Sequence, residues 1–117
     1  MGDLTSIIDP VKMEELRKLG GDTNDFLLEL LNNYQSRFAE LITEIEGHHN
    51  AGNLDGLRRS VHSLKGATVS LGLLNISRII KDLDAEVKQA NVDNVETSIK
   101  AMRDLEPELL ELIAALQ

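Results

Sequence analysis

One predicted helix carries, within two turns, a set of side chains that could handle a phosphoryl group. At about 100° per residue, Arg58, Lys65, Gly66 and Val69 lie on the same helical face as His62. An imidazole with the ordinary pKa of about 6.5 is mostly neutral at pH 7, and its free ring nitrogen can attack phosphorus. Neighbouring cations can hold the oxygens of the transferring group. This arrangement suits phosphoryl transfer through His62, although a surface histidine without a role is the better explanation of His62 taken alone.

The opposite face of the same helix is apolar. Its members form a stripe roughly 100° wide, made of Leu54, Leu57, Val61, Leu64, Thr68 and Leu71. His62 lies roughly 130° from the centre of this stripe, so we expect its ring to face solvent. Thr68 belongs to the stripe, and we expect its hydroxyl to bond a carbonyl one turn back and to serve packing.

Gly66 is not explained by helix formation. Inside an exposed helix, glycine costs about 1 kcal/mol relative to alanine. A gap in the side-chain surface one turn from His62 would let the backbone of another protein approach closely, and Val69 could supply part of a modest apolar docking patch. We therefore expect Gly66 and Val69 to contact a partner. Arg58 is a further docking candidate, although a solvated surface position explains Arg58 and Arg59 equally well.

The segment Leu57–Gly72, which reads LRRSVHSLKGATVSLG, resembles the signature of the histidine phosphotransfer (HPt) family. The core of that signature is His-x-Leu-Lys-Gly, followed by a small hydroxyl residue and then Leu-Gly, and all of these are present. Thr68 stands where the family more often has serine, and Val61 and Leu73 stand where alanine is usual. The resemblance covers nearly the whole chain, because the family's fold is a four-helix bundle of about this length with an N-terminal helix.

The resemblance implies a function as a phosphorelay intermediate. His62 would accept a phosphoryl group from a receiver-domain aspartate or a partner kinase and pass it to another receiver aspartate. Lys65 would stabilise the phosphoryl group, and Gly66 would give the receiver room. The implied partners are receiver (response-regulator) domains and a hybrid histidine kinase. Since the receiver would supply the magnesium ion and most catalytic groups, we expect a phosphocarrier without its own cofactor.

Two other functions are compatible with parts of the sequence. A helical adaptor could bind receiver or kinase domains through the same face without being phosphorylated. Glu44, His48 and His49 could suggest a metal site, but adjacent histidines face different directions and an i, i+4 Glu-His pair is common on helix surfaces. A metal-binding bundle would need inward carboxylates, and we expect no metal. The chain also has no glycine-rich phosphate loop, so we expect no ATP site.

The elements that must position these residues follow from i, i+3, i+4 apolar spacing. This spacing predicts a short helix at about 10–19 and longer helices at about 24–47, 54–71, 74–90 and 94–116, with a kink or break near Pro107. Asp9 and Asn53 are suitable N-caps. Four amphipathic helices joined by short loops predict an all-α, antiparallel up-down-up-down four-helix bundle, with the short N-terminal helix across one end.

Composition narrows the remaining possibilities. A chain of 117 residues is expected to form a single domain, 1–117, and a content of 42% hydrophobic but only 3% aromatic residues suits packed helices. The net charge of -8 disfavours binding to nucleic acid or to an anionic membrane. The absence of cysteine excludes disulfides and thiolate metal sites. We expect a cytoplasmic monomer, because four helices can bury their apolar stripes within one chain.

Overall fold

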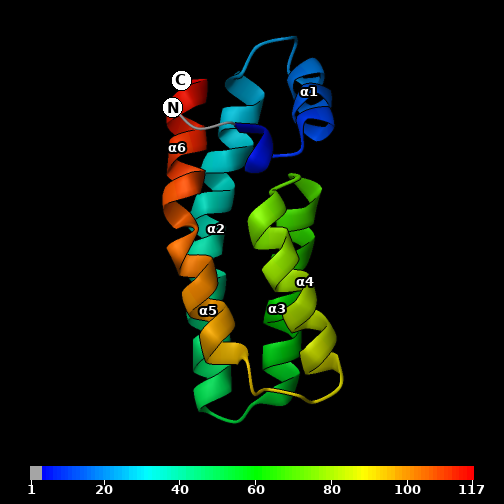
Figure 1. Ribbon diagram of the computed structural model, residues 1–117, viewed down its shortest axis with the longest axis vertical. Coiled ribbons are helices and arrows are strands. Elements are labelled where there is room, and N and C mark those ends of the chain that lie inside the picture. Colours follow the sequence, from blue (N-terminus) through cyan, green and yellow to red (C-terminus); the bar gives the residue numbers. More distant parts are fainter. Residues whose placement is uncertain (1–3) are drawn as a thin grey trace.

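The computed structural model describes residues 4–117, in which every regular element is helical (Figure 1). In chain order these are the short 3-10 helix η1 (Leu4–Ser6) and the helices α1 (Pro10–Leu19), α2 (Asp25–Asn50), α3 (Leu54–Ser70), α4 (Leu74–Lys88), α5 (Val95–Asp104) and α6 (Glu106–Leu116). Helices α2, α3 and α4, with α5 and α6 in succession, form an elongated bundle, and the molecule measures 45 × 26 × 20 Å. The predicted all-α four-helix architecture is confirmed.

Side-chain caps begin two of the helices. The Oδ1 atom of Asp9 accepts a hydrogen bond of 3.0 Å from the backbone N–H of Val11 at the start of α1. The Oδ1 atom of Asn53 accepts one of 3.0 Å from the backbone N–H of Gly56 at the start of α3. Because α3 carries the candidate histidine, the second cap fixes the start of the helix that positions the site.

Two helix ends differ from those expected. Helix α2 continues through Gly47 to Asn50, beyond the expected end at 47, and the chain turns at Gly52, which has a φ of +69°. Helix α4 stops at Lys88 and does not reach residue 90, because Ala90 has a φ of +60° and so lies in the left-handed region. A right-handed helix cannot continue through a residue in the left-handed region, so Gly52 and Ala90 determine where the turns after α2 and α4 lie.

The interruption expected near Pro107 is a complete break. Helix α5 ends before Leu105 and α6 begins directly after it, with Pro107 in the first turn of α6. In a first turn the missing N–H of proline has no intrahelical partner to lose, so the new helix forms without the cost of a mid-helix proline. Figure 1 shows α5 and α6 following one another along α2.

The segment before α1 fastens the turn between α3 and α4. Gly72 in this turn has a φ of +70°, and its carbonyl accepts a hydrogen bond of 2.8 Å from the backbone N–H of Asp9. The N–H of Leu74 donates to the carbonyl of Ile7 at 2.9 Å, and Ile8 is fully buried. These contacts hold α1 at one end of the bundle (Figure 1).

The core is aliphatic and includes the predicted stripe of α3. Leu57, Val61, Leu64 and Thr68 are all buried, while Leu54 at the start of the helix is only partly buried. Within residues 4–117, no helix combines the length and the apolar character needed to cross a bilayer. With its stripe packed on the core, α3 has a fixed rotation about its own axis, and this sets which residues face outward.

Candidate functional site

His62 projects from the middle of α3 into solvent. Its side chain is 68% exposed, whereas Val61 and Leu64 on the same helix are fully buried. The contrast follows from the helical period, because the apolar stripe anchors α3 on the core and leaves position 62 on the other side. The imidazole is therefore placed where a protein partner can reach it.

A buried carboxylate, which the sequence interpretation missed, lies against His62. The side chain of Asp84 in α4 is 4% exposed, and its Oδ1 atom lies 3.9 Å from Nδ1 of His62. Its Oδ2 atom accepts hydrogen bonds of 2.8 Å from Nζ of Lys65 and 2.8 Å from Nζ of Lys88. Two ammonium groups offset the cost of removing this carboxylate from water.

The sequence did contain a signal for Asp84. It falls four residues after Ile80 and three before Val87, both of which are fully buried, so it occupies the apolar stripe of α4. Charged residues are almost never buried unless they are paired, so an acid at such a position indicates a nearby cation. Periodicity could not say which cation, because Lys65 comes from another helix, 19 positions earlier.

The charges around Asp84 shift two pKa values. Burial by itself raises the pKa of the Asp84 carboxyl, but the hydrogen bonds from Lys65 and Lys88 outweigh burial and hold that pKa below its ordinary value. The hydrogen bond to Asp84, reinforced by its charge, raises the pKa of the Lys88 ammonium. Asp84 and Lys88 are therefore both charged at neutral pH.

Asp84 also distinguishes the two ring nitrogens of His62. The distance of 3.9 Å between Nδ1 and Oδ1 exceeds that of a hydrogen bond, but it places a negative charge beside Nδ1 and not beside Nε2. A carboxylate next to one imidazole nitrogen favours the proton on that nitrogen. The carboxylate is therefore on the Nδ1 side of the ring, and the Nε2 side faces away from Asp84.

Gly66 and Val69 share the exposed surface of α3 with His62. A Cβ atom added at Gly66 would meet no atom within 4 Å, so internal packing does not require glycine there. Val69 is 39% exposed and, with Leu74 and Arg78, lines a cleft of about 370 Å³ near the turn between α3 and α4. The structure thus provides open surface and an apolar patch on the side of His62.

Arg58 is engaged within the protein. Its Nε atom donates a hydrogen bond of 2.9 Å to the carbonyl of Val87, and its guanidinium donates a second one of 3.3 Å to the carbonyl of Lys88. These carbonyls belong to the last turn of α4, and the Val87 carbonyl also accepts a hydrogen bond of 3.0 Å from the backbone N–H of Ala90. Arg58 therefore caps α4, a role that depends on where another helix ends and that α3 alone could not reveal.

Thr68 lies in the core beneath this surface. It is fully buried, and its hydroxyl donates to the carbonyl of Leu64 at 2.7 Å, one turn back as expected. Its oxygen is also 2.8 Å from the hydroxyl of Tyr34 in α2, a partner that the sequence interpretation missed. Thr68 therefore joins α3 to α2 and does not reach the surface of His62.

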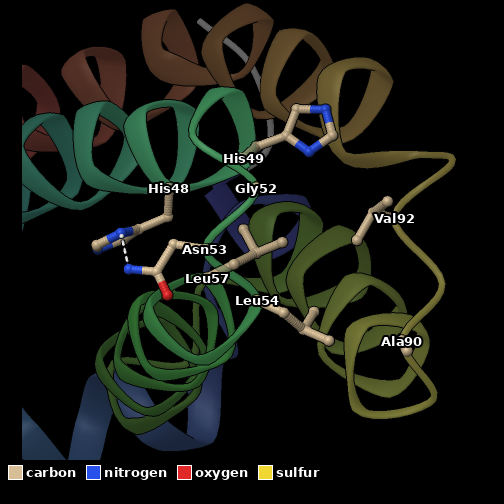
Figure 2. Close-up of a pocket in the computed structure, with 8 residues that line it drawn as sticks. All are labelled: His48, His49, Gly52, Asn53, Leu54, Leu57, Ala90 and Val92. Atoms are coloured by element: carbon tan, nitrogen blue, oxygen red, sulfur yellow. Dashed lines mark hydrogen bonds between the residues drawn. The ribbon is translucent and has the colours of Figure 1, made fainter.

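The other two histidines lie in the last turn of α2, where Figure 2 shows them beside a pocket. His48 and His49 border a pocket of about 250 Å³ whose apolar lining includes Leu54, Leu57 and Val92. The two rings point in different directions, and Nδ1 of His48 lies 3.2 Å from the side-chain nitrogen of Asn53. Within residues 4–117, no three potential ligands come together as a metal site would require.

Charge is distributed unevenly over the bundle. Helices α3 and α4 contain six of the 12 basic residues but only four of the 20 acidic ones. The basic residues are Arg58, Arg59, Lys65, Arg78, Lys81 and Lys88, and the acidic ones are Asp55, Asp82, Asp84 and Glu86. The two helices that flank the candidate site are therefore net positive in a chain whose net charge is -8. Such a surface attracts an acidic partner.

The chain is a small helical module with an exposed histidine in the middle of α3. The family model of the Hpt domain matches residues 29–117, and the chain belongs to this family. The crystal structure of histidine-containing phosphotransfer protein B (HptB) from Pseudomonas aeruginosa PAO1 has the same fold, with a TM-score of 0.81 and 18% identity over 92% of this chain and 91% of that chain. No curated protein sequence matches.

Family membership supports a phosphotransfer role in phosphorelays. Hpt domains are phosphocarriers and not enzymes in the usual sense, and they work with receiver domains and kinases. The family match includes all of α3 and α4, and hence the histidine, the buried carboxylate and both of its lysines.

Proposed function

We propose that this protein carries a phosphoryl group on His62, accepting it from one receiver-domain aspartate and passing it to another. The observation that carries the proposal is the exposed imidazole of His62 beside the buried Asp84, in a chain of the Hpt family. The structure supports this function because an exposed ring, with the Asp84 carboxylate on its inner side, can enter the active site of another protein.

The chemistry follows from the two ring nitrogens. Nε2 of His62 attacks the phosphorus of the aspartyl phosphate, the N–P bond forms, and the P–O bond breaks to regenerate the receiver's carboxylate. The ring keeps its proton on Nδ1 and gains a positive charge, which the Asp84 carboxylate stabilises. Transfer to a second receiver is the same step in reverse. Lys65, one turn from His62, is the cation that we propose holds the phosphoryl oxygens once it leaves Asp84.

Docking involves the exposed surface around His62. The receiver provides the metal ion and most of the catalytic groups in the HPt family, so this chain needs only to present the histidine and bind the partner's acidic site. Gly66 leaves room for the partner's backbone, and Val69 supplies apolar contact. The positive charge of α3 and α4 raises the encounter rate with the acidic site. A small contact of this kind suits a transient complex.

The decisive test is phosphotransfer profiling with purified receivers. The chain and its H62Q variant are each incubated with phosphorylated receiver domains, and protein-bound phosphate is assayed for lability in acid and stability in alkali. We expect labelling of the unmodified chain and none of H62Q, with the same far-UV CD spectrum for both. Labelled H62Q would refute the site.

The same experiment separates the carrier from the helical adaptor. An adaptor would bind receivers, for example in a pull-down, without becoming labelled by any of them. Because Lys65 is proposed to act on the phosphoryl group, K65A should lower the yield of phosphohistidine and still bind receivers. An unchanged yield in K65A would make Lys65 a structural partner of Asp84 only.

A further inference from the structure

Asp84 is paired with two ammonium groups, one more than is required to neutralise its charge. Its Oδ2 atom accepts hydrogen bonds of 2.8 Å from both Lys65 and Lys88, although one ammonium group suffices to neutralise one carboxylate. The two lysines come from different helices. Lys65 reaches across from α3, and Lys88 follows Asp84 by four residues on α4. The Lys88 contact is therefore local to one helix, so it can form without Lys65.

The two lysines also differ in their access to His62. Lys65 follows His62 by three residues on α3, so the two lie one turn apart on neighbouring parts of the surface. However, the Nζ atom of Lys65 is directed to a carboxylate that is 4% exposed. A phosphoryl group on Nε2 would lie on the side of the ring away from Asp84, since Nδ1 faces the carboxylate. Lys65 has to turn outward to reach that group.

A lysine that turned away would normally leave a buried charge behind. Removing the partner of a buried carboxylate is strongly destabilising, which would oppose any movement of Lys65 toward the phosphoryl group. Lys88 removes this obstacle because it is already in place at 2.8 Å from the same oxygen. The incoming phosphoryl group, with a charge of about −2 at neutral pH, supplies the attraction that moves Lys65.

Building on the proposed function, we infer that Lys88 is a positioning residue: it holds Asp84 while Lys65 exchanges this carboxylate for the phosphoryl group on His62. In the unmodified protein both lysines share Asp84. In the phosphorylated protein Lys88 alone neutralises Asp84, and Lys65 binds the phosphoryl oxygens. Lys88 thus acts on phosphohistidine through Lys65 and without touching the phosphoryl group.

The exchange can be followed by NMR of the lysine ammonium groups. Potassium phosphoramidate, which phosphorylates imidazole directly, loads His62 without any receiver, and the H62Q variant serves as the blank. On loading, we expect the Nζ signal of Lys65 to move strongly and that of Lys88 to remain in the position of a carboxylate-bound ammonium. In K88A the Lys65 signal should move little, and K88R should restore the movement.

The functional readout is the yield of phosphohistidine after equilibration with phosphorylated receiver. K88A should lose roughly tenfold, the size expected when one charge-assisted hydrogen bond to phosphate is lost, whereas K88R and the control K100A should match the unmodified chain. Lys100 is exposed on α5 and has no ion pair within residues 4–117. A stable fold in K88A is checked by CD.

Two results would overturn the inference. One is a full Lys65 shift in chemically loaded K88A; the other is a Lys65 signal that does not respond to loading of the unmodified chain. Either result leaves the carrier function standing if receivers still label His62. Conversely, a chain that no receiver labels but whose lysines exchange on chemical loading would refute the proposed function and retain the exchange.

Discussion

Removing both cations from Asp84 should cost far more stability than removing either one. In K65M or K88M the carboxylate keeps one ammonium at 2.8 Å, and methionine preserves the apolar stem of the side chain. We expect each single change to lower the free energy of unfolding by less than about 1 kcal/mol. The double variant leaves a carboxylate that is 4% exposed with only the imidazole of His62 nearby, and we expect a loss of about 3 kcal/mol.

The pH dependence of this loss has a definite sign. In the unmodified protein the folded pKa of Asp84 is lowered, so its stabilisation is present above the unfolded pKa of about 3.9 and disappears as pH falls through the folded pKa. In the double variant burial raises the folded pKa, so the penalty appears as pH rises above about 4. The difference in unfolding free energy between the two proteins should therefore grow from acidic to neutral pH.

Urea unfolding followed by far-UV CD, at several pH values, measures these differences. The matched control is the double variant K81M/K100M, which removes two exposed lysines that have no ion pair within residues 4–117 and should cost little at any pH. If the losses in K65M and K88M simply add, or if the double variant loses the same free energy at acidic and neutral pH, the two lysines do not substitute for one another at Asp84.

Three further changes test the rest of the site. Thr68→Val leaves the buried hydroxyl of Tyr34 without its partner and should lower the free energy of unfolding by about 1–3 kcal/mol. The same change should cost less in a protein that already has Tyr34→Phe. Additive losses of the two changes in thermal or urea unfolding would contradict the pairing. Gly66→Gln should slow transfer from a phosphorylated receiver while the melting temperature holds or rises, because a Cβ there meets nothing; unchanged transfer would remove Gly66 from the docking surface. Arg58→Ala should speed amide hydrogen exchange in the last turn of α4 and lower the free energy of unfolding by about 1 kcal/mol, with little change in phosphotransfer. A selective loss of phosphotransfer would instead support a docking role for Arg58.

Sequence patterns predicted which residues of a helix are buried or exposed, but they missed the side-chain contacts between two helices. The outward position of His62 and the burial of Leu64 follow from the helical period of α3, which is a local property. The capping of α4 by Arg58 and the pairing of Asp84 with Lys65 depend on the spacing and rotation of neighbouring helices. Periodicity along the chain does not report contacts between helices. An acidic residue within an apolar stripe does indicate that such a contact exists, but not which residue makes it.

The break at the C-terminal helix shows a different limit. A proline inside a helical pattern is compatible with a kink or with two helices, because each removes the same clash. The structure has two helices, because Leu105 ends α5 and precedes α6, and Pro107 then lies in the first turn of α6. The packing of both pieces against α2 determines this outcome, and that packing is tertiary.

Under the proposed function, the charge of the site would change when His62 is phosphorylated, and this change would affect release of the partner. Together, Asp84, Lys65 and Lys88 have one surplus positive charge. A phosphoryl group of about −2 on a ring that gains one positive charge brings the cluster close to neutral. The receiver, meanwhile, has regained a free carboxylate. In the proposed transfer, electrostatic attraction between the two surfaces would therefore be greatest before the step and weaker after it. The residues that would attract a phosphorylated receiver to His62 would then also favour its departure once the phosphoryl group had moved.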